Sequence, residues 1–356
     1  MYVRNCWYVA AWDHELKPGE VISRSLINEP VALYRAGDGK VVGLADRCCH
    51  RLAPLSLGRI EGDDLRCMYH GLKFDRGGAC VEIPGQDMIP ATACVKSYPV
   101  VEKHSWIWVW MGDPAKADEA LIPPAVGFED PRWTLRSGHM DYDANYLLIN
   151  DNLTDFTHLS YVHAKSFGVS EVFARTRPNV ERLDRGVRIW RWIADDSVRD
   201  AKTAVHRRAE GDNWQTYDYL APGILLMHTA VCPQGTAERL GHKPPDLSQV
   251  EVLSENFTSQ AVTPMTDKTS RYFFSWGPRA EAGSDAVADA MLGVANMAFN
   301  EDKAIIQAQQ KVVDLYPDVK PVLTSADVGP MLMRSVIDRM IAAESAPATA
   351  KAASAA

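Results

Sequence analysis

The segment that decides the fold runs from Cys48 to His70 and reads C-C-H-R-L-A-P-L-S-L-G-R-I-E-G-D-D-L-R-C-M-Y-H. It holds the pattern C-x-H at residues 48–50 and, after sixteen intervening residues, C-x-x-H at residues 67–70. Glycines and prolines interrupt the surrounding sequence every few residues, which is typical of short strands joined by turns. Two neighbouring loops of this kind bring together two thiols and two imidazoles, so the segment predicts a metal site.

The pairing of residue types in these loops favours an iron–sulfur cluster. Two cysteines on one iron and two histidines on the other hold a [2Fe-2S] cluster, and neutral imidazole in place of thiolate raises its reduction potential. A structural zinc site is the alternative. Zinc fingers group Cys with Cys and His with His, whereas each loop here carries one of each. We therefore expect Cys48, His50, Cys67 and His70 to bind a [2Fe-2S] cluster.

A second cluster of ligand types lies in residues 150–163, which read N-D-N-L-T-D-F-T-H-L-S-Y-V-H. On a helix, Asp151, Asp155 and His158 would share one face. His158 and His163 would lie about 140° apart around an ideal α-helix. Both histidines can reach one metal ion only if the helix is interrupted between them, so we predict an irregularity at residues 159–162.

Two histidines and one carboxylate bind Fe(II) and leave positions open for O₂ and substrate. The best candidate for the carboxylate is Asp302, on a predicted long helix over residues 286–315. Its neighbours one turn away are apolar, and an ionised carboxylate there is costly unless a metal or a cation compensates it. Glu301 has similar neighbours, so the pattern alone chooses weakly between the two. A surface pair of Asp302 with Lys303 is the other interpretation.

The chain divides into regions of different character. Residues 1–115 read as an all-β domain, in which S-W-I-W-V-W-M at residues 105–111 is a strand buried on both faces. Residues 116–133 are a proline-rich linker, and residues 134–343 form a second domain. We expect a helix over 145–163, strands near 187–193, 217–220, 224–228 and 272–276, a further helix over 335–343, and a disordered tail from 344 to 356.

Composition excludes several classes of protein. The chain has 38 basic and 46 acidic residues, a net charge of −8, which argues against nucleic-acid binding. It has no long apolar run for a membrane span and no recognisable signal peptide. Seven cysteines at low density do not suggest a disulfide framework, so we expect a cytoplasmic protein. Neither a dinucleotide-binding glycine motif nor a P-loop is present, so NADH would act through another protein.

The chain resembles the Rieske non-haem iron aromatic oxygenases. The resemblance rests on C-C-H-R-L-A-P-L-S and C-M-Y-H-G-L, on R-N-C-W-Y-V-A-A-W near the start, on W-I-W-V-W-M-G-D-P, and on D-N-L-T-D-F-T-H. It extends to about residue 343 and is greatest for the group of vanillate O-demethylase, dicamba O-demethylase and toluenesulfonate methyl-monooxygenase. One departure is Cys49, where the family usually has proline.

The resemblance implies an α+β fold, with an N-terminal all-β Rieske [2Fe-2S] domain and a C-terminal helix-grip catalytic domain built on an antiparallel sheet around a long helix. It favours Asp302, with His158 and His163, as the ligands of a mononuclear Fe(II). It also implies a homotrimer, in which Asp155 bridges His70 of one subunit and His158 of the next. A carboxylate acting only within its own subunit is the alternative for Asp155.

The implied function is that of the oxygenase component of a multicomponent monooxygenase. Electrons from NADH would arrive through a ferredoxin-type reductase, and O₂ would hydroxylate a methyl or methoxy group of a small aromatic acid; a hydroxylated methoxy group then collapses to phenol and formaldehyde. Ring hydroxylation or dioxygenation is the alternative within the family. An electron-transfer protein with a ligand-binding domain is the alternative from another class. Possible pocket residues, or ordinary sheet core, are Trp190, Trp192, Trp214, His228 and Trp276.

Overall fold

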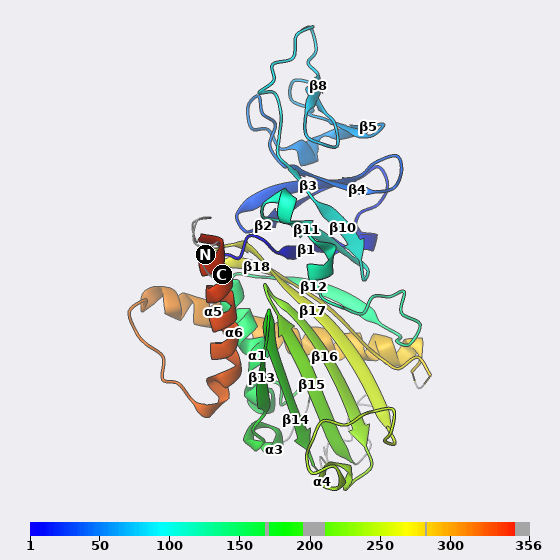
Figure 1. Cartoon of the computed structure of the whole chain (residues 1–356), viewed down its shortest axis with the longest axis vertical. Coiled ribbons are helices and arrows are strands. Elements are labelled where there is room, and N and C mark those ends of the chain that lie inside the picture. The colour runs from blue at the N-terminus through cyan, green and yellow to red at the C-terminus, as the bar shows by residue number, and fades with distance from the viewer. Residues whose placement is uncertain (168–170, 195–210, 282, 346–356) are drawn as a thin grey trace, which may run out of the picture. The chain divides into compact units, whose positions relative to one another are not determined.

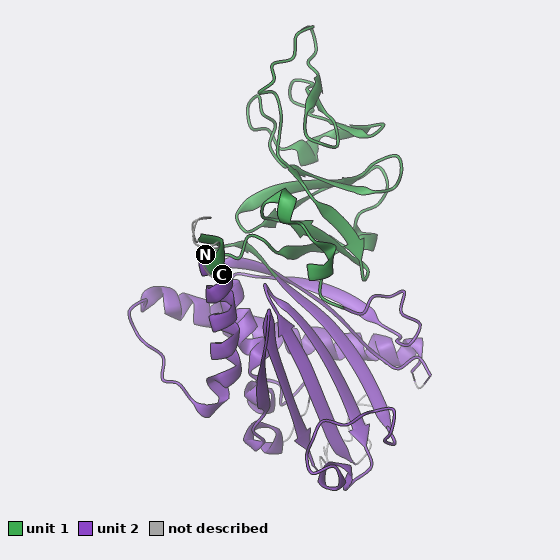
Figure 2. Cartoon of the chain, in the orientation of Figure 1, with its two compact units in different colours: residues 1–124, 263–267, 343–356 green, residues 125–262, 268–342 purple. Residues whose placement is uncertain are grey.

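The computed structural model describes residues 1–167, 171–194, 211–281 and 283–345. The chain forms two compact units, shown in Figure 2. Unit 1 comprises Met1–Pro124, Thr263–Asp267 and the C-terminal residues from Ala343, and unit 2 comprises Ala125–Val262 and Lys268–Ala342. Most of the expected disordered tail, residues 346–356, lies outside the described residues. No helix in the described part of the chain is long and apolar enough to cross a membrane.

Unit 1 contains three antiparallel sheets and, within residues 1–115, only short 3₁₀ turns besides the strands, as the sequence predicts. In sheet order the strands are β1 (Trp7–Trp12), β11 (Trp106–Trp110) and β10 (Val100–Lys103); β2 (Val21–Leu26), β3 (Glu29–Arg35), β4 (Val41–Ala45) and β9 (Ser97–Tyr98); β5 (Arg59–Glu61), β6 (Asp64–Arg66), β7 (Lys73–Phe74) and β8 (Cys80–Glu82).

Strand β11 is the buried centre of its sheet, and all five of its residues are inaccessible to solvent. It pairs with β1 on one side and β10 on the other. Trp110 contacts Trp7 at 5.4 Å between ring centroids, and Trp106 contacts Trp12 at 5.1 Å. Aromatic pairs of this kind add to the stabilisation from burial alone. The prediction of a strand buried on both faces is confirmed.

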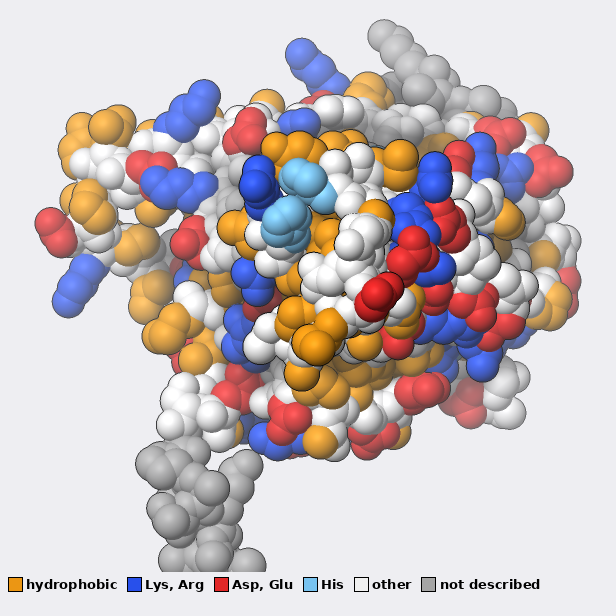
Figure 3. Space-filling view, turned by 90° about the horizontal axis from the view of Figure 1, so that it is seen from above, with side chains coloured by type: hydrophobic (Ala, Val, Ile, Leu, Met, Phe, Trp, Pro, Cys, Tyr) orange, Lys and Arg blue, Asp and Glu red, His pale blue; other side chains and the backbone are white. Residues whose placement is uncertain are grey.

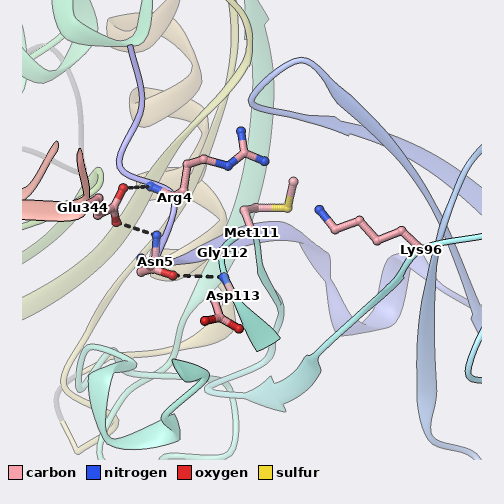
Figure 4. A pocket seen from close by; sticks show the side chains of 7 residues that line it. All are labelled: Arg4, Asn5, Lys96, Met111, Gly112, Asp113 and Glu344. Atoms are coloured by element: carbon pink, nitrogen blue, oxygen red, sulfur yellow. Dashed lines mark hydrogen bonds between the residues drawn. The ribbon is translucent and has the colours of Figure 1, made fainter. Parts of the chain in front are cut away.

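Unit 1 also takes in the last helical residues of the chain (Figure 4). The carboxylate of Glu344 accepts hydrogen bonds from the backbone N–H groups of Arg4 at 2.8 Å and Asn5 at 2.6 Å. The side-chain oxygen of Asn5 accepts a third from the backbone N–H of Asp113 at 3.0 Å. Hydrogen bonds to Glu344 therefore hold the N-terminal segment against a helix end more than 300 positions later in the chain.

Unit 2 is a seven-stranded antiparallel sheet with a long helix on one face, which confirms the expected α+β class (Figure 1). Helix α5 (Asp285–Leu315) packs against β12 and β18, where Phe299 contacts Tyr272 and Phe274. In sheet order the strands are β12 (Arg136–Tyr142), β18 (Thr269–Pro278), β17 (Ser254–Thr266), β16 (Ile224–Cys232), β15 (Asp212–Leu220), β14 (Gly186–Ile193) and β13 (Asn179–Leu183).

The last helix is longer than the sequence suggests. Helix α6 spans Val328–Ser345, whereas the expected helix covered only residues 335–343. Its first turn contains Gly329 and Pro330. Proline is tolerated in the first turn because its missing N–H has no acceptor within the helix. The other helices in the described part of unit 2 are α1 (Tyr146–Thr154), η5 (Phe156–His158), α2 (Leu159–Val162), α3 (Glu171–Arg175), α4 (Thr236–Arg239) and η6 (Ser325–Asp327).

Candidate metal centres

The two loops that carry the cysteine–histidine motifs in unit 1 have the same backbone pattern. The carbonyl of Cys48 accepts a hydrogen bond from the N–H of Leu52, and that of Cys67 from the N–H of Gly71, each at 3.0 Å. The N–H of each cysteine donates to the carbonyl five residues further on, at 2.8 Å in both loops. Leu52 and Gly71 both have left-handed backbone conformations, with φ of 59° and 81°. The two loops therefore form matching turns, each of which carries one cysteine and one histidine.

The thiols lie inside and the imidazoles lie at the surface. Cys48 and Cys67 are buried, whereas His50 and His70 are exposed with their ring centroids 4.6 Å apart. Burial, with the neighbouring Cys67 thiol, raises the pKa of Cys48 to about 11 in the metal-free chain. In the space-filling view of Figure 3, adjacent histidine side chains lie at the surface beside hydrophobic and basic ones. Two inner sulfurs and two outer nitrogens fit the donor set of a [2Fe-2S] cluster of mixed ligation.

In unit 2, three side chains meet at a single carboxylate oxygen. Asp302 Oδ1 lies 3.2 Å from His163 Nε2 and 3.5 Å from His158 Nε2. Asp302 is buried in α5, and no Lys or Arg among the described residues pairs with it. Donor atoms of one ion lie about 3 to 4 Å apart when each metal–ligand bond is about 2.1 Å. The set of two histidines and one carboxylate therefore fits Fe(II) in both spacing and chemistry.

The far nitrogen of each imidazole is held by an acceptor. His158 Nδ1 lies 2.7 Å from the backbone carbonyl of Asp155, and His163 Nδ1 lies 2.9 Å from Glu301 Oε2. These oxygens only accept hydrogen bonds, so each Nδ1 carries a proton and Nε2 is the nitrogen that a neutral ring offers to a metal ion. The sequence left Glu301 open as a rival ligand. The structure instead places it behind His163, where Ser166 Oγ donates to the same carboxylate oxygen at 2.6 Å.

Charge and burial act differently on the two histidines. Burial lowers the pKa of His158, and the charge of Asp302 offsets only part of that effect. Burial also acts to lower the pKa of His163, but hydrogen bonds to Asp302 and Glu301 outweigh it and raise the pKa. His158 is therefore the readier neutral ligand, and a metal ion that binds His163 displaces the proton it shares with Asp302.

Asn152 adds a further donor to the site, a role that its position near the metal face in the sequence left open beside one in the helix turn. Its Nδ2 group donates to Asp302 Oδ1 at 3.0 Å and lies 3.3 Å from His158 Nε2. It projects from the last turn of α1, so it links that helix to α5. The amide holds the carboxylate in the orientation that faces both histidines.

The predicted irregularity between the histidines is wrong in position. Residues 159–162 form a regular α-helical turn, and the interruption comes earlier, at Asp155 (φ −134°, ψ 103°). Its Oδ1 accepts a hydrogen bond from the N–H of Thr157 at 2.9 Å, which ends α1 and starts the 3₁₀ turn of η5. Asp and Asn favour this capping position because their side chains satisfy free N–H groups. The tighter turn and the end of α2 at His163 bring His158 and His163 to one oxygen.

The shared face expected for Asp151, Asp155 and His158 is also wrong, because the break at Asp155 separates them. Asp151 points to another partner, accepting a hydrogen bond from Arg334 Nε at 2.8 Å. Asp155 uses its side chain as a cap and its carbonyl to hold His158. Only one of the three, His158, approaches Asp302.

The aromatic candidates divide between the two faces of the sheet. Trp190, Trp192 and Trp214 pack together in a cluster with Ala230 and Cys232, which is ordinary sheet core. Trp276 lies on the other side, where its ring contacts Phe167, which in turn contacts His163 at 5.1 Å. His228 Nε2 donates a hydrogen bond to Glu255 Oε1 at 2.6 Å.

Two protein-family descriptions match the chain. Residues 6–99 match the Rieske [2Fe-2S] domain. Residues 142–343, more than half of the chain, match the vanillate O-demethylase oxygenase C-terminal domain. The first match holds both cysteine–histidine loops, and the second holds the two histidines and the carboxylate of the second site.

Known proteins resemble the chain over nearly its whole length. The iron–sulfur subunit of the toluene-4-sulfonate monooxygenase system from Comamonas testosteroni is 42% identical, covering 97% of this chain and 98% of that protein. The oxygenase component of dicamba O-demethylase from Stenotrophomonas maltophilia is 33% identical, covering 97% and 99%. The crystal structure of dicamba monooxygenase with non-haem iron and dicamba has a TM-score of 0.76 at 28% identity, covering 96% and 98%. The chain therefore belongs to the vanillate O-demethylase family of Rieske non-haem iron oxygenases, whose cofactors are a [2Fe-2S] cluster and a mononuclear iron.

Proposed function

We propose that the chain is the oxygenase component of a monooxygenase system that hydroxylates a methyl or methoxy group of a small aromatic acid. Electrons come from NADH through a separate ferredoxin-type reductase, and O₂ is the co-substrate. The observation that carries the proposal is the meeting of His158, His163 and Asp302 at one buried oxygen, in a chain that also carries the two cysteine–histidine loops. The relatives named for toluene-4-sulfonate and dicamba support the substrate class.

In this proposal Cys48, Cys67, His50 and His70 hold the cluster, and His158, His163 and Asp302 hold the iron. When bound, the cluster supplies single electrons and the iron activates O₂. The chain itself fixes the geometry of these donors. Hydrogen bonds at each Nδ1 hold both imidazoles with Nε2 toward Asp302, and donors held in this way are typical of metal sites.

We also propose that Asp155 connects two subunits of a homotrimer. Its Oδ1 accepts both hydrogen bonds that cap η5, from the N–H and the hydroxyl of Thr157. Within the described residues no donor reaches Oδ2, so this oxygen is available to the His70 imidazole of a neighbouring subunit. Because the Asp155 carbonyl already holds His158, one residue would then contact both imidazoles. A ring of three chains closes such a head-to-tail contact.

The test uses the purified chain with a ferredoxin-type reductase, NADH and O₂. We expect toluene-4-sulfonate to give the hydroxymethyl product, and 4-methoxybenzoate to give a phenol and one formaldehyde per NADH consumed. With ¹⁸O₂, one labelled atom should enter the hydroxymethyl product. We expect three irons per chain. Formation of a ring cis-diol would contradict methyl hydroxylation, and two irons per chain without substrate oxidation would indicate an electron-transfer protein.

A further inference from the structure

A row of polar side chains crosses one face of the unit 2 sheet. The strand register pairs Arg191 of β14 with Gln215 of β15, Gln215 with Thr229 of β16, and Thr229 with Asn256 of β17. Directly opposed residues point to the same face of a sheet. These four side chains, here called the polar row, therefore lie side by side, and three strand spacings separate its ends by about 14 Å.

One contact places the Gln215 part of the polar row on the face that carries the metal-site histidines. Tyr217 lies two residues after Gln215 on the same strand and so points the same way. Its ring lies 4.5 Å from that of Phe156, which contacts His158 at 6.2 Å. The sheet face with the polar row is therefore the face covered by η5.

A second contact places the Asn256 end of the polar row on the face that carries the metal-site histidines. Asn256 Oδ1 accepts a hydrogen bond from Trp276 Nε1 at 2.8 Å. Trp276 contacts Phe167, and Phe167 contacts the His163 ring. Asn256 and Thr229 are partly exposed, whereas Gln215 and Arg191 are buried. The polar row thus has a partly exposed end at Asn256, which Trp276 and Phe167 connect to His163. Its other end, at Arg191, is closed.

Arg191 is a buried cation that has no carboxylate partner among the residues the structure describes. It is 1% exposed, and its guanidinium lies 4.4 Å from the ring centroid of Phe173. Arg191 Nη1 donates hydrogen bonds to the backbone carbonyls of Thr176 at 3.3 Å and Phe173 at 3.5 Å. Its Nε group has no acceptor among the described residues. No Asp or Glu of the described chain forms an ion pair with it. A buried, uncompensated charge is costly, so this arrangement calls for an anion.

Neighbouring polar groups on the same face also lack partners. Gln215 Oε1 and Gln260 Oε1 are buried and make no hydrogen bond by geometry. Amide oxygen and nitrogen atoms exchange by rotation about the side chain, so Gln215 can present a donor to a ligand. Buried polar groups normally have partners, and a set left without them points to a missing ligand with several acceptors.

We propose that Arg191 and Gln215 bind the oxyanion of the aromatic substrate, a carboxylate or a sulfonate. This rests on the proposed function and adds the residues that select the substrate class. With the anion at the closed end of the polar row, the remainder of the substrate extends toward the end nearest His163. Arginine suits this role because its planar donors pair with two oxygens of one anion.

The test measures binding by calorimetry on the iron-loaded holoenzyme, independently of turnover. The probes are toluene-4-sulfonate and its neutral analogue 4-tolyl methyl sulfone. We expect the wild-type chain to prefer the anion, and Arg191→Gln to weaken binding of the anion about 30- to 100-fold while leaving that of the sulfone nearly unchanged. Arg191→Lys should restore part of the preference, because it keeps the charge but loses the paired donors.

The matched control is Arg188→Gln. Arg188 lies three residues away on the same strand but points to the opposite face, where it pairs with Asp218. This variant should keep the wild-type preference. If Arg191→Gln fails to fold, as judged by circular dichroism and cluster absorption, Gln215→Met becomes the deciding variant. This variant keeps the Arg191 cation and should weaken binding of the anion about 3- to 10-fold relative to binding of the sulfone.

Two outcomes would overturn the proposal. One is an unchanged ratio of anion to sulfone affinity in Arg191→Gln, or in Gln215→Met where that variant decides. The other is a wild-type chain that binds neither probe or binds both equally. Failure of the proposed function is separate, because a chain that oxidises no substrate but prefers the anion through Arg191 would still support this site.

Discussion

Asp302 and Glu301 stand next to each other on α5 and act on opposite sides of one imidazole. Asp302 Oδ1 faces His163 Nε2, while Glu301 holds His163 Nδ1. The apolar neighbours of both carboxylates predict that each needs a polar partner, and both have one. The sequence pattern could not assign which carboxylate faces which nitrogen, because that depends on the rotation of α5 against a turn about 140 residues earlier in the chain.

Asp302→Asn should remove the mononuclear iron and leave the cluster. The amide lacks the negative charge that compensates a divalent ion, so iron content should fall from three to two per chain and substrate oxidation should be lost. Iron analysis, together with the EPR spectrum of the reduced cluster, separates the two centres. A variant that retains three irons would show that Asp302 is not a ligand.

Glu301→Gln should weaken the iron site without abolishing it. The neutral amide can still approach His163 Nδ1 but no longer offers a charged acceptor, and losses of about 10- to 100-fold in metal affinity or activity are usual for such changes. The measurement is iron retention against a chelator series. Asp289→Asn, an exposed change of equal charge on the same helix, is the control and should behave as wild type. Equal iron retention in both variants would contradict the role of Glu301.

At the scale of elements, the long strands and α5 follow from patterns that act locally. Continuous apolar runs such as W-I-W-V-W predict buried strands, and the helix over 286–315 differs from α5 by one residue at its start. The predicted interruption at residues 159–162 differs from the observed one at Asp155 because two local signals compete in this segment. Spacing of the histidines favours a break between them, whereas an aspartate followed by Thr157 favours a cap. The cap prevails, because it satisfies a free N–H directly.

The sheet of β2, β3, β4 and β9 contains an acid-sensitive contact. Glu29 on β3 accepts hydrogen bonds from Lys96, Arg4 and Tyr98. Burial acts to raise its pKa, but these three hydrogen bonds outweigh it and hold the pKa at about 2. The unfolded chain therefore takes up the proton first as the pH falls. The stability from Glu29 is complete above about pH 5 and is lost progressively from there toward pH 2.

Glu29→Gln should lower the free energy of unfolding by about 1 to 2 kcal/mol at pH 7. The difference from wild type should stay constant between pH 7 and 5 and shrink by pH 3.5. Urea unfolding followed by tryptophan fluorescence measures it. Glu20→Gln, at an exposed position before β2, should change neither value. A difference that grows toward low pH would contradict the assignment.

At the scale of the whole molecule, the proposed function requires electrons to pass between two centres built by separate stretches of chain. Sequence motifs could predict the cysteine–histidine set and the two histidines of the second site, since each group lies within a short segment. Asp302 lies on another helix, and only the family resemblance favoured it over Glu301. They could not show Arg191 as a buried cation, because the pairing of four strands places it there. Nor could they show Asn152 between Asp302 and His158.

Asp155→Asn tests the proposed contact between subunits. Asparagine is as good a cap as aspartate, so η5, both metal centres and the trimer should persist. Turnover should fall about 10- to 100-fold, because the amide offers the neighbouring subunit's His70 no charged acceptor, while the backbone carbonyl of residue 155 still holds His158. Sedimentation should give three times the 39.5 kDa of one chain for wild type and variant alike. Asp184→Asn, an exposed change in the β13–β14 turn, is the control. Undiminished turnover in Asp155→Asn would end the bridge model.

The composition of unit 1 has a consequence for how the protein is made. Ile27 and Asn28 donate hydrogen bonds to the carbonyls of Pro264 and Met265, and Glu344 holds the backbone of Arg4 and Asn5. Domains usually fold in order as they leave the ribosome. Here the amino-terminal unit also needs Pro264, Met265 and Glu344, which are synthesised long after Met1–Pro124. Its final closure therefore follows the synthesis of residue 344, and a nascent chain truncated before that residue releases an unfinished amino-terminal unit.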